Sequence, residues 1–162
     1  MKDNCMKNTI LLTNKDFFSA VKEEIAEGLT LRIKPKGESM TPFIVAGRDE
    51  IILSMPCECS FRRGSILLAE IGADRQVAHR VLRVDGEIVT LRGDGNLVLT
   101  EQCSRSDVIA EVVAIVRKGK KIKKGSLRWT LFSYLWPSSP LLRRVLLKIY
   151  YLYNRGKETE NS

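Results

Sequence analysis

The chain has 162 residues, of which 44% are hydrophobic and 28% charged, so it can form a packed core. This length suits one domain, or one domain with an appendage. No stretch reaches the roughly 18 uninterrupted apolar residues that a membrane-spanning helix needs, and the first 14 residues show no secretory signal pattern. Four cysteines in such a context are expected to be reduced thiols. We therefore expect a cytoplasmic protein, or one held at the inner face of the membrane.

The net charge of +8 is concentrated near the C-terminus. Residues 1–116 carry 15 Lys or Arg and 17 Asp or Glu, whereas residues 117–157 carry 12 Lys or Arg and no acid. Such a basic segment favours an anionic partner, either nucleic acid or lipid, although it could also be a solvated surface.

The first predicted element is an amphipathic helix over residues 15–27, with Phe17, Phe18, Val21 and Ile25 at helical spacing. Asn14 is its candidate N-cap, and Gly28 is the expected stop. From Leu29 onward the period changes to the alternation of a half-buried strand, and further strand-like runs follow at 50–54, 65–71, 76–84, 87–92 and 108–117. Many short strands without βαβ alternation predict a mainly β body.

After this body we expect a basic loop at 118–125, then two short helices in 127–153 that Pro137 and Pro140 separate. The predicted organisation is an N-terminal helical segment at 1–28, a β domain at 29–117 and a basic, amphipathic helical tail at 118–162.

The segment KGESMTPFIVAG, at residues 36–47, contains a candidate nucleophile. Gly37 permits a tight turn, and Thr41–Pro42 is typical of the start of a short helical turn that Gly47 would end. Ser39 would then lie where free backbone N–H groups gather, and such groups stabilise an oxyanion. The alternative is that Ser and Thr before Pro only begin a helix. Met40 is expected to pack into the body.

His79, in QVAHRVLRV, is the only histidine of the chain, and a lone histidine in an apolar strand is often structural. Asp85–Gly86 predicts a two-residue hairpin turn. If Val84 then pairs with Glu87, Arg92 lies opposite His79. Asp94, in the GDGN segment, falls on the diagonal of the same face, within reach of the imidazole. Asp94 could therefore orient His79, and Arg92 would favour its neutral form.

Three segments in order, GESMTP, HRVLRV and GDGN, resemble the serine peptidases of the signal peptidase I and LexA-like superfamily. The match covers about residues 30–117 and follows the histidine-base variant, since no lysine lies between Gly37 and Lys118. The resemblance implies a LexA/signal-peptidase-like fold, Ser39 as nucleophile, His79 as general base and a peptide or protein substrate. Backbone N–H groups around Gly37, Glu38 and Ser39 would hold the oxyanion.

The leading hypothesis is a serine endopeptidase with a Ser–His site, extended to Ser–His–Asp if Asp94 takes part. One alternative is a LexA-like self-processing regulator, although only 36 residues precede Gly37 and they predict a single helix. The other is a catalytically silent module on this fold that binds peptides or membranes.

No metal or other cofactor is expected. Cys57, Cys59 and Cys103 lack the Cys-x₂₋₄-Cys spacing of a zinc site. Aromatic and basic side chains alternate in 127–153, which suits either an anionic membrane surface or a hairpin packed on the body or on a second copy. Nucleic acid is the less favoured partner, and the oligomeric state stays open.

Overall fold

A computed structural model describes residues 14–72, 75–137 and 139–159. Within these ranges, eight strands form one antiparallel sheet in the order β1-β2-β7-β3-β4-β5-β6, with β8 paired to β7. The predicted mainly β fold, with a helix before it and helices after it, is therefore confirmed. The first half of the predicted 1–28 segment and the last residues of the tail lie outside the described residues.

The bounds of the elements are as follows. The helices are α1 (Asn14–Ala26), α2 (Leu127–Leu135) and α3 (Pro140–Thr159). The strands are β1 (Leu31–Ile33), β2 (Asp49–Ser54), β3 (Ile66–Ile71), β4 (Arg75–Asp85), β5 (Ile88–Arg92), β6 (Glu101–Ser104), β7 (Val108–Arg117) and β8 (Lys120–Lys123).

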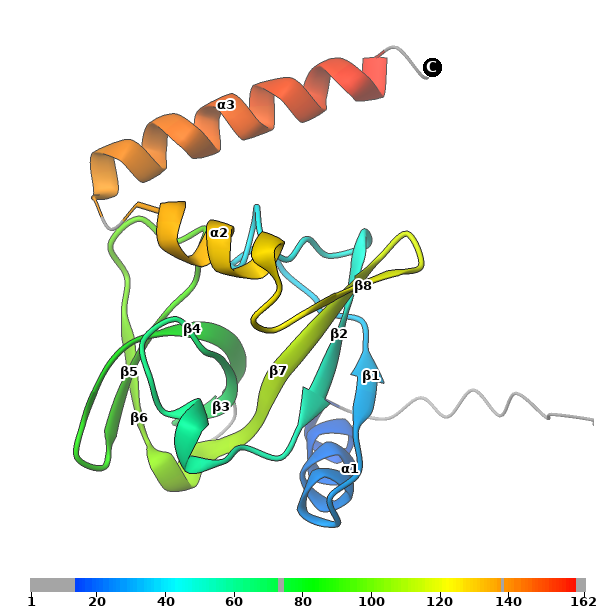
Figure 1. The fold of residues 1–162 in the computed structure, drawn as a ribbon, viewed down its shortest axis with the longest axis vertical. Helices are drawn as coiled ribbons and strands as arrows, with labels where there is room; N and C mark the ends of the chain where they lie inside the picture. The colour runs from blue at the N-terminus through cyan, green and yellow to red at the C-terminus, as the bar shows by residue number, and fades with distance from the viewer. Residues whose placement is uncertain (1–13, 73–74, 138, 160–162) are drawn as a thin grey trace, which may run out of the picture.

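Helix α1 confirms the prediction from apolar spacing. Val21 and Ile25 are buried in the main core, and Gly28 ends the helix with φ +81°, a conformation that favours glycine. Figure 1 shows α1 against one end of the sheet, α2 across the opposite end, and α3 beyond α2 as the outermost element. The main core cluster includes residues of α1 and α2, and a second cluster of buried residues lies among β3, β4, β5 and β6.

The hairpin of β4 and β5 differs from its prediction by its register. Its turn is Gly86–Glu87 rather than Asp85–Gly86, because Asp85 pairs with Ile88. A bulge between Val81 and Arg83 then sets Arg80, and not His79, opposite Arg92. A shift of one residue moves a side chain to the other face of a sheet, so Arg92 lies on the face of Arg80.

Two strands were not predicted. Residues 118–125 were expected to be a loop, but Lys118 and Gly119 have φ values of 48° and 75°, and strand β8 folds back on β7 through them. Ile122 is the only buried residue of β8, and lysines occupy its other positions. The apolar alternation that would predict a strand is therefore absent from this segment. Strand β6, with the sequence EQCS, has too few apolar residues to stand out.

The C-terminal region continues the packed body. Ser126 caps α2 by accepting from the Trp129 N–H, and Trp129 is buried against Phe43 in the core. Pro137 and Pro140 separate α2 from α3, as predicted, but α3 is 20 residues long rather than short. Among the described helices, none combines the length and apolarity needed to cross a membrane.

Candidate active site

Ser39 and His79, which are 40 residues apart in the chain, meet beside β4, an interior strand of the sheet. The Ser39 hydroxyl lies 2.9 Å from Nε2 of His79. Strand β4 supplies the buried imidazole, and the turn after Gly37 supplies the half-buried serine. This distance suits proton transfer between a hydroxyl and a base.

The segment that carries Ser39 is a series of turns rather than the predicted helical turn from Thr41. The Thr41 N–H donates to the Glu38 carbonyl at 2.9 Å, and the Ile44 N–H donates to that of Met40. The Thr41–Pro42 peptide is cis. Met40 is buried in the core, as predicted, and so anchors the residue beside the serine.

Asp49, at the start of β2, holds the far end of this segment. Its carboxylate accepts from the Val45 N–H at 2.9 Å and pairs with Arg48 and Arg117. Arg117 also donates to the Phe43 carbonyl at 2.7 Å. Burial alone would raise the pKa of Asp49, but the hydrogen bonds from Arg117 and Arg48 lower it below the usual value. The ionised carboxylate therefore fixes the chain that follows the nucleophile.

Two glycines of the GDGN segment let the backbone approach Ser39 closely. The Gly95 N–H donates to the Ser39 carbonyl at 2.8 Å. A Cβ atom on Gly93 would lie 2.3 Å from that carbonyl oxygen and 3.1 Å from Nε2 of His79. One on Gly95 would lie 2.9 Å from the Glu38 carbonyl oxygen. The segment is therefore part of the site and not only a turn.

Glu101 of β6, and not Asp94, faces the second ring nitrogen of His79. Its Oε2 lies 2.6 Å from Nδ1, and both side chains are buried. The other oxygen, Oε1, lies 2.6 Å from a guanidinium nitrogen of Arg75. Leu91 of β5 pairs with Glu101 of β6 on one side and with Val81 of β4 on the other, so Glu101 reaches the imidazole across β5.

The prediction that Asp94 would orient His79 is therefore wrong in its geometry. Asp94 is fully buried and accepts two hydrogen bonds from Arg80, at 2.8 and 2.7 Å. The register of β4 and β5 explains why Asp94 contacts Arg80 and not His79, because Arg92 pairs with Arg80 and Asp94 follows two residues later. The expected partner of Arg92 was wrong for the same reason.

Burial lowers the pKa of His79, although the Glu101 carboxylate opposes this effect. Arg75, and not Arg92, is the positive charge that lowers it further. Nδ1 and the Glu101 carboxylate are 2.6 Å apart but are not aligned as a hydrogen bond. A carboxylate this close to Nδ1 favours the neutral tautomer that carries its proton on Nδ1. Its Nε2 is then free to accept the proton of the Ser39 hydroxyl.

The backbone positions predicted for the oxyanion side are Gly37 and Glu38. Gly37 is exposed and adopts φ +80°, which favours glycine. The carbonyls of Glu38 and Ser39 accept hydrogen bonds from Thr41 and Gly95. Among the described residues, the N–H groups of Glu38 and Ser39 donate no hydrogen bond, so they are available to a substrate oxygen.

Helix α3 extends to the rim of this site. The Tyr151 hydroxyl donates to Oε2 of Glu38 at 3.4 Å, next to the nucleophile. Nearer the start of α3, the buried Arg143 donates to the carbonyls of Gly93, Asp94 and Asn96. The helix is thus attached to the loop that contacts Ser39.

The cysteines differ from the expectation of free thiols. Cys57 and Cys59 form a disulfide bond. Cys103 is a buried free thiol, and burial raises its pKa to about 11, so it is a poor nucleophile. In the described part of the chain, no group of three or more His, Cys, Asp or Glu is placed to hold a metal ion.

Sequence reasoning missed Glu101 because its strand was not recognised. The available signal was weak: Glu101 is the one acid between Asp94 and Asp107. A comparison with models of protein families finds no match for this chain, and a comparison with curated proteins finds none either.

Proposed function

We propose that this chain is a serine endopeptidase that uses Ser39 as nucleophile, His79 as general base and Glu101 to position the imidazole. The observation that carries the proposal is the 2.9 Å contact between the Ser39 hydroxyl and Nε2 of His79, with Glu101 2.6 Å from Nδ1. A nucleophile, a base and a group that orients the base form the arrangement that activates a serine. The resemblance of GESMTP, HRVLRV and GDGN to signal peptidase I and LexA-like peptidases points to the same chemistry.

In the first step, Nε2 of His79 takes the hydroxyl proton while the Ser39 oxygen attacks the substrate carbonyl carbon. The backbone N–H groups of Glu38 and Ser39 stabilise the resulting oxyanion. The imidazolium, held by Glu101, then returns the proton to the leaving amine, which leaves an acyl-enzyme. Water, activated by the same histidine, releases the acyl group and restores the serine.

A fluorophosphonate probe tests this proposal directly, because it reacts only with an activated serine. We expect one covalent label per wild-type chain by intact mass, and none in Ser39→Ala. Ser106→Ala is the matched control, since Ser106 is exposed and lies outside the site. An unlabelled wild-type protein, or a label that persists in Ser39→Ala, would favour a catalytically silent binding module.

In the alternative of a self-processing regulator, the substrate lies in the same chain as the active site. Mixing active enzyme with a tagged Ser39→Ala chain distinguishes the cases. Cleavage of the tagged chain would show that the chain itself is a substrate in trans, whereas cleavage within the wild-type chain alone would show self-processing in cis. We expect neither, because the proposal assigns the site to a separate peptide or protein.

We also propose that α3 docks the enzyme on an anionic membrane surface, with the enzyme located at the cytoplasmic face. Arg143 and Leu147 of α3 face the body and are buried, so the opposite side of the helix faces away from it (Figure 1). That outer side presents exposed apolar side chains of Leu141, Leu142, Val145, Leu146, Ile149 and Leu152. Exposed Arg144 and Lys148 lie along its flank.

An apolar stripe with cations beside it suits the plane of an anionic bilayer, where apolar burial and charge attraction add. Exposed Leu127, Leu131 and Leu135 repeat the pattern on α2. Because Tyr151 contacts Glu38, docking would bring the Ser39 site close to the lipid surface.

Vesicle co-sedimentation tests the docking. We expect binding to phosphatidylserine-containing vesicles, weaker binding in high salt and little to pure phosphatidylcholine. A Leu142→Asp/Ile149→Asp double variant should lose binding, whereas Ile88→Asp, at an exposed position of β5, should keep it. If the wild type ignores anionic vesicles but dimerises through this face, as judged by loss of dimer in the double variant, the occupant is a second copy.

A further inference from the structure

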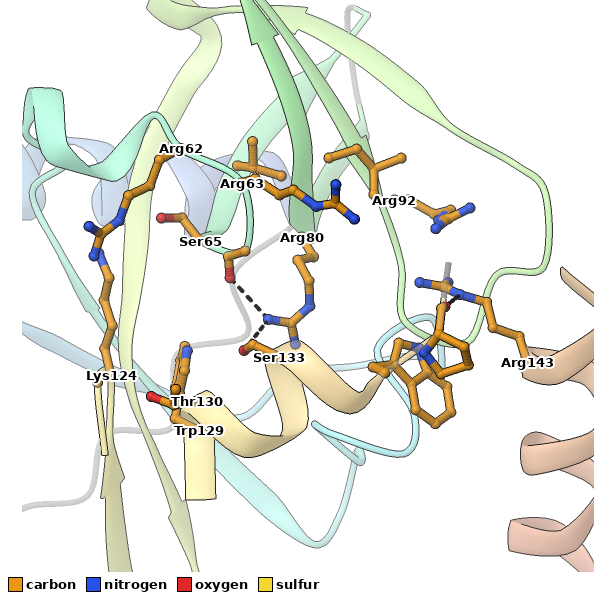
Figure 2. Close-up of a pocket in the computed structure, with 16 residues that line it drawn as sticks. Arg62, Arg63, Ser65, Arg80, Arg92, Lys124, Trp129, Thr130, Ser133 and Arg143 are labelled. Atoms are coloured by element: carbon orange, nitrogen blue, oxygen red, sulfur yellow. Dashed lines mark hydrogen bonds between the residues drawn. The ribbon is translucent and has the colours of Figure 1, made fainter. Parts of the chain in front are cut away.

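A basic pocket lies on the other side of β4 from His79. It has a volume of about 650 Å³ and is enclosed by the Arg62–Ser65 loop, β4, the end of β5, α2 and the start of α3 (Figure 2). Six cationic side chains line it: Arg62, Arg63, Arg80, Arg92, Lys124 and Arg143. Neither Ser39 nor His79 belongs to its lining, so it is separate from the candidate active site.

The positive charge of this pocket exceeds the negative charge that the protein supplies. Asp94 pairs with Arg80, and Glu111 pairs with Lys124. In the described ranges, no carboxylate forms an ion pair with Arg62, Arg92 or Arg143. Arg143 is buried and donates only to backbone carbonyls.

Like charges also lie close together here, and the Asp94 carboxylate, which acts on both Arg92 and Arg143, is already paired with Arg80. Burial first, and then the charge of Arg92, lowers the pKa of Arg143 to about 10. Figure 2 shows Arg92 and Arg143 on one side of the pocket, Arg62 and Lys124 on the other, and Arg80 between them. Such a cluster is unfavourable unless an anion is present to neutralise it.

Two buried polar atoms of lining residues lack a hydrogen-bond partner. The Ser65 side chain is 2% exposed and its Oγ has no partner, and Nε of Arg92 has none either. A buried donor without a partner destabilises the fold. A bound ligand with several acceptor atoms could satisfy these two atoms from inside the pocket.

We propose that this pocket binds a phosphate-bearing organic ligand. Arginine forks bind phosphate oxygens with several hydrogen bonds at once, and the hydroxyls of Ser65, Thr130 and Ser133 add donors. The volume exceeds that of a lone phosphate and falls in the range of small-molecule sites. Trp129, Trp136 and Pro137 offer an apolar wall for the organic part. The ligand is either a soluble phosphate ester or the headgroup of a phospholipid.

The site shares a loop with the candidate active site, although it does not depend on catalysis. Arg143 holds the carbonyls of Gly93 and Asp94, and Gly95 of the same loop donates to the Ser39 carbonyl. A ligand between Arg92 and Arg143 would therefore stabilise α2, α3 and this loop together.

Titration calorimetry on the full chain tests the site, with pyrophosphate, adenosine diphosphate and dihexanoyl phosphatidic acid below its micelle concentration as probes. We expect each chain to bind one ligand. Tighter binding of adenosine diphosphate would indicate a soluble phosphate ester, and tighter binding of dihexanoyl phosphatidic acid would indicate a phospholipid headgroup. Arg92→Gln should weaken binding at least tenfold, and Ser65→Ala several-fold. Arg83→Gln, an exposed arginine on β4 outside the pocket, is the matched control and should bind like the wild type.

Arg92→Lys keeps the positive charge but loses the two-pronged guanidinium group. We expect this variant to fold normally, as checked by thermal melting, and to bind the probes more weakly than the wild type. Absence of binding for all three probes in the wild type would overturn the proposal. Equal weakening by Arg92→Gln and Arg83→Gln would also overturn it, because it would reveal general surface attraction only.

Discussion

His79 and Arg80 are consecutive residues of β4 that serve two different sites. His79 contacts Ser39 and Glu101, whereas Arg80 pairs with Asp94 and lines the basic pocket. Side chains alternate between the faces of a strand, so two neighbours point in opposite directions. A single strand thus forms the wall between the candidate active site and the pocket.

Removal of either member of the Ser39–His79 pair should abolish cleavage. Ser39→Ala and His79→Ala should each lower kcat by a factor on the order of 10⁶, and the double variant should lose little more, because the two groups act as a unit. Steady-state kinetics with a peptide library supply the measurement, and melting curves check folding. Wild-type rates in either variant would exclude the assignment.

Glu101→Gln should lower kcat by a factor on the order of 10²–10⁴, because an amide can hold the wrong tautomer of His79. The comparison with Glu70→Gln on β3, outside the site, controls for the loss of a carboxylate. An unchanged rate would make Glu101 a structural partner of Arg75.

Activity should fall on the acid side with a midpoint below 6.5, the ordinary pKa of histidine. Burial lowers the pKa of His79, so the neutral base persists to lower pH before protonation inactivates it. Since the Glu101 carboxylate raises the pKa of His79, Glu101→Gln should move this acid limb of the pH profile to still lower pH. The measurement is kcat/KM against pH, and a limb at or above 6.5 would contradict the assignment of His79.

Asp94→Asn should destabilise the fold by about 3–5 kcal/mol, because it leaves the buried Arg80 without a counter-charge. Asp85→Asn is the control: Asp85 pairs with Arg83 on the surface, where such a pair contributes about 1 kcal/mol or less. Urea unfolding measures both. If instead Asp94→Asn keeps full stability and moves the acid limb of the pH profile, Asp94 acts on His79 as first predicted.

Gly93→Ala should reduce activity strongly, because its Cβ would lie 2.3 Å from the Ser39 carbonyl oxygen and would displace the nucleophile. Gly86→Ala is the control, since its φ of +59° costs about 1–2 kcal/mol of strain without any contact near Ser39. Comparable activity in the two variants would show that the close approach is not needed.

Local sequence patterns predict most of the elements. The spacing of Val21 and Ile25 predicts α1, Gly28 predicts its end, and short motifs single out Ser39 and His79, whose side chains lie 2.9 Å apart. These features depend on local periodicity and on short motifs, which the order of residues carries directly.

Which acid faces His79 depends on how the strands pair in three dimensions. The register of β4 with β5 depends on a turn at Gly86–Glu87 and a bulge after Val81, and a shift of one residue exchanges the faces. Glu101 comes from a strand with little apolar signal. The basic pocket likewise joins arginines from four separate segments, because chain packing, and not sequence spacing, sets the distance between them.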